Sequence, residues 1–173
     1  NFFIDRFRYF MKEKQIRFDI IEASISSSSL NKLFSSFEKA KYLNKIINDQ
    51  VGLDIISSFK RASNILDSEM KNREVEITNS TDPGIFKTEA EKNLYKKIIE
   101  INKYYSNINN NENYGQSLLI LAGAKKEIFD FFDNVKVNEE NETLRKNRLE
   151  LINMLCKTFQ NFINFQLLKT NNE

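Results

Sequence analysis

Helical spacing of apolar residues, with few residues to interrupt it, most constrains the fold of this chain. Its 173 residues include one proline and four glycines, so helix breakers are scarce and helices should dominate. The clearest apolar stripe lies between positions 51 and 71, where apolar residues recur every three or four positions, as on one face of a helix: Ile55, Phe59, Ala62, Leu66 and Met70. We therefore predict an all-α helical bundle.

The C-terminal part of the chain carries the longest apolar pattern and one exception to it. An aromatic segment closes on Asp133, and an amphipathic helix follows whose apolar face runs from Leu144 to Phe162. Arg148 falls in the middle of that face. Because an unpaired buried charge is very costly, Arg148 needs an acidic partner. The nearest candidates before the helix are Asp130 and Asp133, and we predict a structural ion pair between Asp133 and Arg148.

Other helix boundaries can be located from capping residues. Thr88 followed by Glu91 is a capping-box pattern, which predicts the start of a helix that continues to about position 105. A further apolar helix is expected over residues 114–135. Residues 134–141 then form an extended crossing before the final helix, because valines alternate with polar residues there.

The composition argues against a self-contained active site. Histidine is absent, which removes the commonest general base and metal ligand. The single Cys156 reads as a small buried apolar residue, which is consistent with a reducing cytoplasm. We expect no metal site and no cofactor in this domain. No apolar run is long enough to span a membrane. The net charge is +2, so any nucleic-acid surface must be a local patch.

One such patch is suggested on the polar side of the helix over positions 51–71. Lys60, Asn64 and Lys71 form an outward row, with Arg61 on its flank. Donors in a row on a helix suit contact with phosphates or base edges. An ordinary solvated face has the same pattern, so both interpretations stay open on this evidence.

Four stretches, in this order, resemble the C-terminal region of the β subunit of bacterial heterotetrameric glycyl-tRNA synthetase. They are FFIDRFRYFMKEKQIRFDIIEA (2–23), FKRASNIL (59–66), DPGIFKTEAEKNLY (82–95) and FFDNVKVNEENETLRKNRLELINML (131–155). The last contains the Leu-Arg-x-Asn-Arg-Leu signature. Lys136 and Asn138 depart from the family, which usually has methionine there.

The resemblance implies a DALR-type anticodon-binding helical domain over residues 26–173, preceded by a helical segment of the adjoining body over residues 1–25. It implies recognition of the glycine tRNA anticodon stem-loop by a fragment that is itself non-catalytic. The parent enzyme, a glycine–tRNA ligase, would use ATP and Mg²⁺, chiefly on the α subunit of an α2β2 tetramer in the cytoplasm. Lys60, Arg61, Asn64 and Lys71 become the first candidates for RNA contact, and Arg145 and Lys146, at the expected exposed start of the last helix, the second.

Two alternatives compete with this interpretation. A helical protein–protein interaction module would explain the periodicity and the missing catalytic residues, but not four ordered motifs. The anticodon-binding domain of an arginyl-type synthetase would also be helical. The terminal helix here lacks the glycine-containing stretch followed by proline and methionine that closes that domain.

Overall fold

The computed structural model describes residues 2–26, 32–73, 77–78, 80–107 and 113–169. Within these residues the chain is helical and contains no strand, which confirms the all-α prediction. The helices are α1 (Phe2–Glu13), α2 (Phe18–Ser26), α3 (Leu33–Ile46), α4 (Gln50–Arg73), α5 (Glu89–Asn107), α6 (Tyr114–Ala122), α7 (Lys125–Asn134) and α8 (Glu142–Gln160), with 3-10 turns η2 (Pro83–Ile85) and η3 (Phe165–Leu167).

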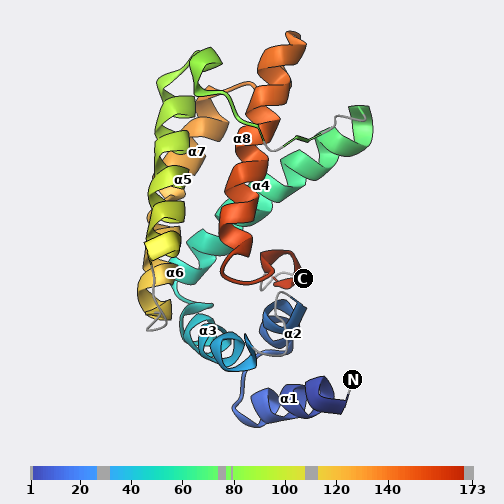
Figure 1. The fold of residues 1–173 in the computed structure, drawn as a ribbon. Coiled ribbons are helices and arrows are strands. Elements are labelled where there is room, and N and C mark those ends of the chain that lie inside the picture. The colour runs from blue at the N-terminus through green and yellow to red at the C-terminus, as the bar shows by residue number, and fades with distance from the viewer. Residues whose placement is uncertain (1, 27–31, 74–76, 79, 108–112, 170–173) are drawn as a thin grey trace.

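The helices form a bundle with a smaller N-terminal group beneath it (Figure 1). Helices α5, α7 and α8 lie side by side, and α4 crosses against α8. Helices α1, α2 and α3 lie at the other end of the molecule, where α2 packs on both α3 and η3. Of the described residues that precede α5, Thr78 and Asp82 lie against α8.

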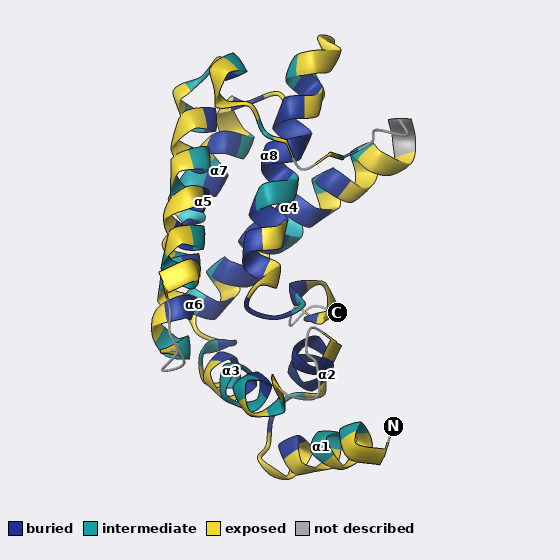
Figure 2. Ribbon diagram, viewed as in Figure 1, coloured by how far each residue is buried: buried dark blue, intermediate teal, exposed yellow. Residues whose placement is uncertain are grey.

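The core lies where α4, α8 and η3 meet. The rings of Phe59, Phe159 and Phe165 pack together with centroid separations of 6.0, 5.6 and 5.7 Å. Figure 2 shows the buried faces of α4 and α8 turned toward one another. The predicted α4 stripe is buried from Ile55 to Leu66, whereas Met70, one turn further on, is 41% exposed.

Helix α2 is joined to the C-terminal segment by hydrogen bonds. The backbone N–H of Asn164 donates to the Ala23 carbonyl oxygen at 3.1 Å, and the Lys169 N–H donates to the Asp19 carboxylate at 2.8 Å. Burial of Asp19 by itself would raise the pKa of its carboxyl. The Arg17 guanidinium and the Lys169 N–H outweigh burial, so that pKa lies below its ordinary value.

The prediction of one helix over residues 114–135 is wrong in one respect. The chain turns after Ala122, and α7 starts at Lys125. Gly123 closes α6, its N–H donating to the Leu119 carbonyl oxygen at 2.9 Å. After α7 the backbone of Val135 is extended, as expected for the crossing, and Val135 is buried while Lys136 and Asn138 face solvent.

Candidate nucleic-acid interface

The polar row on α4 borders a hollow near the C-terminal end of the described chain. Asn64 and Lys71 are exposed and Lys60 is half-buried. The hollow has a volume of about 640 Å³ and lies between α4 and the segment around η3. Its polar lining comes from Lys60, Ser63, Asn64, Asp67, Gln166 and Lys169. The row therefore lies at the surface, beside a concave feature.

Arg61 has a different environment from its neighbours in the row. Its guanidinium donates to the Asp133 carboxylate at 2.8 Å and lies over the rings of Phe129 and Phe132, 5.3 and 5.0 Å from their centroids. A guanidinium stacked on aromatic rings and paired with a carboxylate is held in place by both contacts. Arg61 therefore ties α4 to α7.

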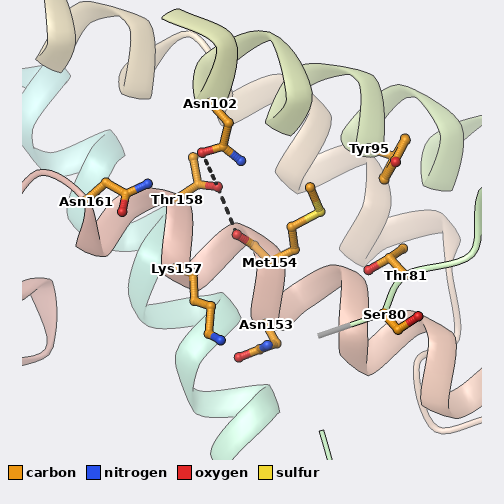
Figure 3. A pocket seen from close by; sticks show the side chains of 9 residues that line it. All are labelled: Ser80, Thr81, Tyr95, Asn102, Asn153, Met154, Lys157, Thr158 and Asn161. Carbon is orange, nitrogen blue, oxygen red and sulfur yellow. Dashed lines mark hydrogen bonds between the residues drawn. The ribbon is translucent and has the colours of Figure 1, made fainter. Parts of the chain in front are cut away.

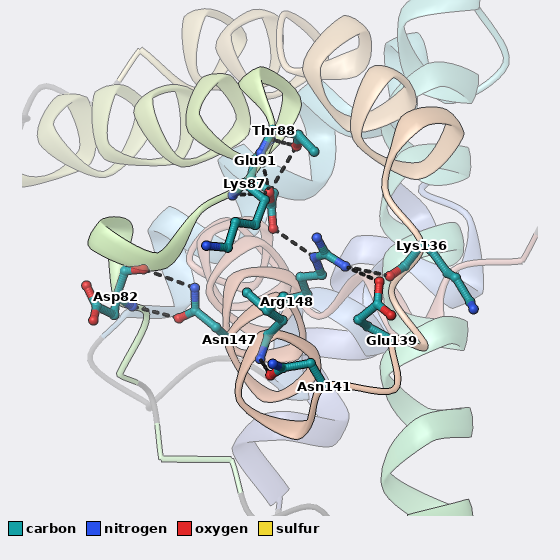
Figure 4. A network of polar contacts seen from close by, with 10 residues as sticks. Asp82, Lys87, Thr88, Glu91, Lys136, Glu139, Asn141, Asn147 and Arg148 are labelled. Atoms are coloured by element: carbon teal, nitrogen blue, oxygen red, sulfur yellow. Dashed lines mark hydrogen bonds and ion pairs between the residues drawn. The ribbon is translucent and has the colours of Figure 1, made fainter.

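Arg148 points into the protein, as its helical phase predicts, but its predicted partner is wrong. Its Nε donates to Glu91 at 2.8 Å, and its Nη1 donates to the Lys136 carbonyl oxygen at 2.9 Å and approaches Glu139 at 3.5 Å (Figure 4). Asp133 instead pairs with Arg61. The sequence-based choice of Asp133 failed because proximity in sequence does not show which helix packs against α8.

Glu91 has two structural roles. One carboxylate oxygen accepts from the Thr88 N–H at 2.7 Å and the Lys87 N–H at 2.8 Å, and the Thr88 hydroxyl accepts from the Glu91 N–H at 3.2 Å. This confirms the capping box. The other oxygen accepts from Arg148. Burial by itself would raise the pKa of Glu91, but Arg148 and the N–H donors outweigh burial and lower it.

The start of α8 is largely exposed, but one of its two candidate residues is buried. The Arg145 residue is only 9% exposed, and its guanidinium donates to the Glu139 carbonyl oxygen at 3.2 Å. The helix start is exposed as expected, but the expectation that Arg145 itself faces solvent there is wrong. Its neighbour Lys146 does face solvent. In the first turn of α8, Glu142 and Thr143 are exposed and Arg145 is the buried residue.

Two further side chains of α8 bond residues that precede α5. Asn147 donates to the Asp82 carbonyl oxygen at 3.0 Å and accepts from the Asp82 N–H at 2.7 Å. Glu150 accepts from the backbone N–H and the hydroxyl of Thr78. The Asn147 carboxamide thus bonds both the backbone N–H and the backbone C=O of one residue, Asp82. These two bonds hold the segment around Asp82 on α8.

A polar pocket of about 480 Å³ lies between α5 and α8 (Figure 3). Tyr95 and Asn102 enter from α5, and Thr81 comes from the segment around Asp82. The α8 side supplies Asn153, Met154, Lys157 and Thr158, with Asn161 just after the helix. The Thr158 hydroxyl lies 3.1 Å from Asn102 Oδ1 and 2.9 Å from the Met154 carbonyl oxygen. Glu91 of α5 contacts Arg148 of α8, and Asn102, later in α5, contacts Thr158, later in α8. The two helices therefore run in the same direction.

Other groups give no sign of a metal or membrane site. Within the described ranges, no three His, Cys, Asp or Glu side chains are arranged to hold a metal ion. Cys156 is buried, and burial raises the pKa of its thiol to about 12. None of the helices described has a stretch apolar and long enough to cross a bilayer.

Comparison with known proteins shows the family. The family model described as the DALR anticodon binding domain matches residues 55–170, a range that begins within α4. The chain belongs to this family. Proteins named glycine–tRNA ligase β subunit are similar over most of the chain. That of Persephonella marina is 31% identical over 170 residues, 98% of this chain and 23% of its own length.

Two further relatives carry the same name. The Sulfurihydrogenibium protein is 31% identical over 168 residues, covering 97% of this chain and 24% of its own, and the Dinoroseobacter shibae protein is 28% identical over 158, covering 91% and 22%. The resemblance of the chain to this subunit is thus confirmed. The chain spans less than a quarter of the length of the curated relatives it matches.

The structure shows the role of the signature motif in this chain. Arg145, Asn147 and Arg148, the polar residues of the Leu-Arg-x-Asn-Arg-Leu signature, are all buried and bonded internally. The motif that carries the resemblance is therefore a structural element, and Lys146 is its only solvent-facing charge.

Sequence reasoning missed the pocket between α5 and α8. Asn153, Lys157 and Asn161 recur every four positions, which places them on one side of α8. That spacing is a signal available in the sequence. The spacing alone does not predict a pocket, because the other wall is formed by Tyr95 and Asn102 of α5.

Proposed function

We propose that this domain binds the anticodon stem-loop of glycine tRNA, as part of a glycine–tRNA ligase β subunit. The family match over residues 55–170 carries the proposal. It is supported by the relatives, which are glycine–tRNA ligase β subunits matched over 91–98% of this chain. Within such a subunit the domain would supply tRNA recognition.

Contact with the RNA backbone would come from the exposed polar residues on α4 and at the start of α8. Asn64, Lys71 and Lys146 are exposed and Lys60 is half-buried, so all four lie where side chains can reach phosphates. Phosphate contacts provide affinity that depends on salt and little on sequence. Arg61 is occupied by Asp133 and two aromatic rings, so its larger role would be to hold α4 on α7.

The chemistry of the parent enzyme would lie outside this domain. Attachment of glycine to tRNA would use ATP and Mg²⁺, chiefly on the α subunit of an α2β2 assembly in the cytoplasm. Aminoacyl transfer needs a site that positions ATP and the tRNA 3′ end together. The pocket and the hollow of this domain are amide-lined or lysine-lined surfaces, suited to binding.

Residues 1–25 would belong, at least in part, to the adjoining body of the longer subunit. Helix α1 carries exposed aromatic side chains: Phe2, Phe3 and Tyr9 are 66, 67 and 64% exposed. Large exposed aromatic groups favour contact with another protein surface. By contrast, the hydrogen bonds from Asn164 and Lys169 to α2 favour placing α2 with the bundle.

The proposal is tested by titrating the 173-residue chain with a fluorescent RNA stem-loop that carries the two adjacent cytosines of a glycine anticodon. We expect tighter binding than to a stem-loop with both cytosines replaced by uracil. The affinity should fall steeply with salt, as counterion release requires. A folded chain that binds neither RNA at low salt would overturn the proposal and favour a protein–protein interaction module.

A further inference from the structure

A groove between α1 and α3 has an aromatic floor. Helix α2 packs against both α1 and α3, and Phe10 of α1 meets Phe37 of α3 with ring centroids 5.1 Å apart. Together with Ile16, these rings line a hollow of about 550 Å³. Phe10 is 40% exposed. The described residues therefore leave part of this apolar floor uncovered.

Three exposed lysines border the floor: Lys14, Lys41 and Lys45. The Lys14 ammonium lies 5.6 Å from the centroid of the Phe10 ring, and the Lys41 ammonium lies 5.9 Å from that of Phe37. None of the described residues that line the groove is acidic. Glu38, which lies outside the lining, pairs with Lys41 at 3.3 Å, but a pair of this kind at the surface is weak. The rim of the groove is therefore basic.

Polar contacts hold the helices that form the groove. Asn44 of α3 accepts from the Arg17 N–H at 2.9 Å and donates to the Gln15 carbonyl oxygen at 3.3 Å. These bonds attach the turn between α1 and α2 to α3. Arg8 of α1 also pairs with Glu22 of α2 at 2.7 Å. The groove is thus formed within the chain and needs no partner to create it.

The charge of the N-terminal part favours an acidic occupant. Residues 1–49 contain nine of the 26 Lys and Arg residues but only six of the 24 Asp and Glu residues, whereas the rest of the chain is slightly acidic. Complementary charge attracts and orients a partner. An aromatic side chain would pack well beside Phe10 and Phe37. The groove therefore suits an acidic segment with one apolar anchor.

We propose that the groove holds an acidic segment of the same subunit, with an aromatic side chain on Phe10 and Phe37 and carboxylates against the three lysines. This occupant rests on the part of the proposed function that places the chain in a β subunit. The chain spans 22 to 24% of its three relatives, so the longer subunit has ample chain to supply the segment. The contact would fix the orientation of the DALR domain on the body of the subunit.

Tethering explains why the segment would come from the same subunit. A segment on the same polypeptide acts at an effective concentration of about 1 mM, so a contact with a Kd of about 100 µM would be mostly filled. A separate protein at micromolar concentration would leave the same groove mostly empty. A small groove with a few rim charges therefore suits an occupant on the same polypeptide.

The test titrates a fluorescent peptide of glutamate and alanine, with one central phenylalanine, with the 173-residue chain. Fluorescence anisotropy measures binding. A peptide with lysine in place of glutamate should bind about tenfold more weakly or less, and so should one with alanine in place of phenylalanine. Equal binding of all three peptides would overturn the proposal.

Two double variants with the same change in net charge locate the binding site. Lys14→Glu combined with Lys45→Glu should weaken binding of the glutamate peptide about tenfold, because it replaces attraction at the rim with repulsion. Lys103→Glu combined with Lys126→Glu is the matched control, at exposed positions of α5 and α7 outside the groove. An equal loss in both would mean unspecific attraction and would overturn the groove. Melting curves check that both variants are folded.

The complete β subunit tests the source of the segment. Because its groove would already be filled by its own segment, it should bind the peptide at least tenfold more weakly than the 173-residue chain does. Equal binding by the chain and the complete subunit would overturn this occupant and would leave the groove open to a separate protein.

Stem-loop titrations separate this inference from the proposed function. The Lys14 and Lys45 double variant should bind the glycine stem-loop as tightly as the control double variant does. Peptide binding without stem-loop binding would support the groove and overturn anticodon recognition. A larger loss of stem-loop affinity in the groove variant than in the control would make these lysines RNA contacts and overturn the groove.

Discussion

Replacing Arg148 with methionine should destabilise the domain by about 3 kcal/mol. The side chains of Arg148 and Glu91 are 6 and 1% exposed, and removing one member of a buried pair costs roughly 3–5 kcal/mol because it leaves an uncompensated charge. The lower end applies because Glu91 keeps the Thr88 and Lys87 N–H donors. For a chain of this size the melting temperature should fall by roughly 6–12 °C. Urea unfolding followed by circular dichroism measures the change.

The loss should depend on pH. In wild type the pKa of Glu91 lies below its ordinary value of 4.5, so the stabilisation from its ionised form is present above that value and is lost as pH falls through the lower, folded pKa. Without Arg148, burial is opposed by fewer donors and the pKa of Glu91 rises. The difference between wild type and Arg148→Met should therefore be largest at neutral pH and shrink below pH 4.5.

Matched variants isolate the ion pair. Lys146→Met alters a solvent-facing neighbour on the same helix and should leave stability within about 0.5 kcal/mol of wild type. Glu91→Gln combined with Arg148→Met removes the unpaired charge, so the double variant should be more stable than Arg148→Met alone. A double variant no more stable than that single variant would refute the reasoning. So would an unchanged melting temperature with lost tRNA binding, which would make Arg148 an RNA contact.

Three further predictions concern the core. Gly52→Ala should cost about 2 kcal/mol or more in urea unfolding, since an added Cβ would clash with the Ile46 backbone carbonyl oxygen, and a smaller loss would mean that α3 can shift. Cys156 should not react with a thiol reagent at pH 8 until urea unfolds the chain, because burial raises the thiol pKa to about 12, and labelling of the native protein would contradict this. Phe165→Ala should cost about 3–5 kcal/mol by calorimetry, since the ring is fully buried, and a cost below 1 kcal/mol would show that η3 is dispensable.

Helical spacing predicted much of the core. The buried positions Ile55, Phe59, Ala62 and Leu66 on α4 follow directly from it. The same spacing included Met70, which is 41% exposed, because periodicity shows which face is apolar but not how far along the helix a partner covers it.

The partners of charged residues could not be predicted in the same way. Helical phase correctly placed Arg148 inside the protein. Its partner Glu91 lies 57 positions earlier in the sequence. Because the capping box already explained why a glutamate stands at position 91, nothing in the sequence pointed to a second role for it. Arg145 was expected outside because it lies in the first turn of the last helix, which was expected to be exposed. Its burial depends on the crossing before α8 folding back over it, which no local pattern shows.

The two contacts between α5 and α8 have a consequence for the thermodynamics of binding. Glu91 meets Arg148 near the starts of the helices, and Asn102 meets Thr158 further along, about 16 Å away at the helical rise per residue. Helices joined at two separated points cannot easily splay or slide, so the walls of the pocket keep their spacing when the pocket is empty. A ligand entering there would lose its own freedom on binding but impose little ordering on the protein.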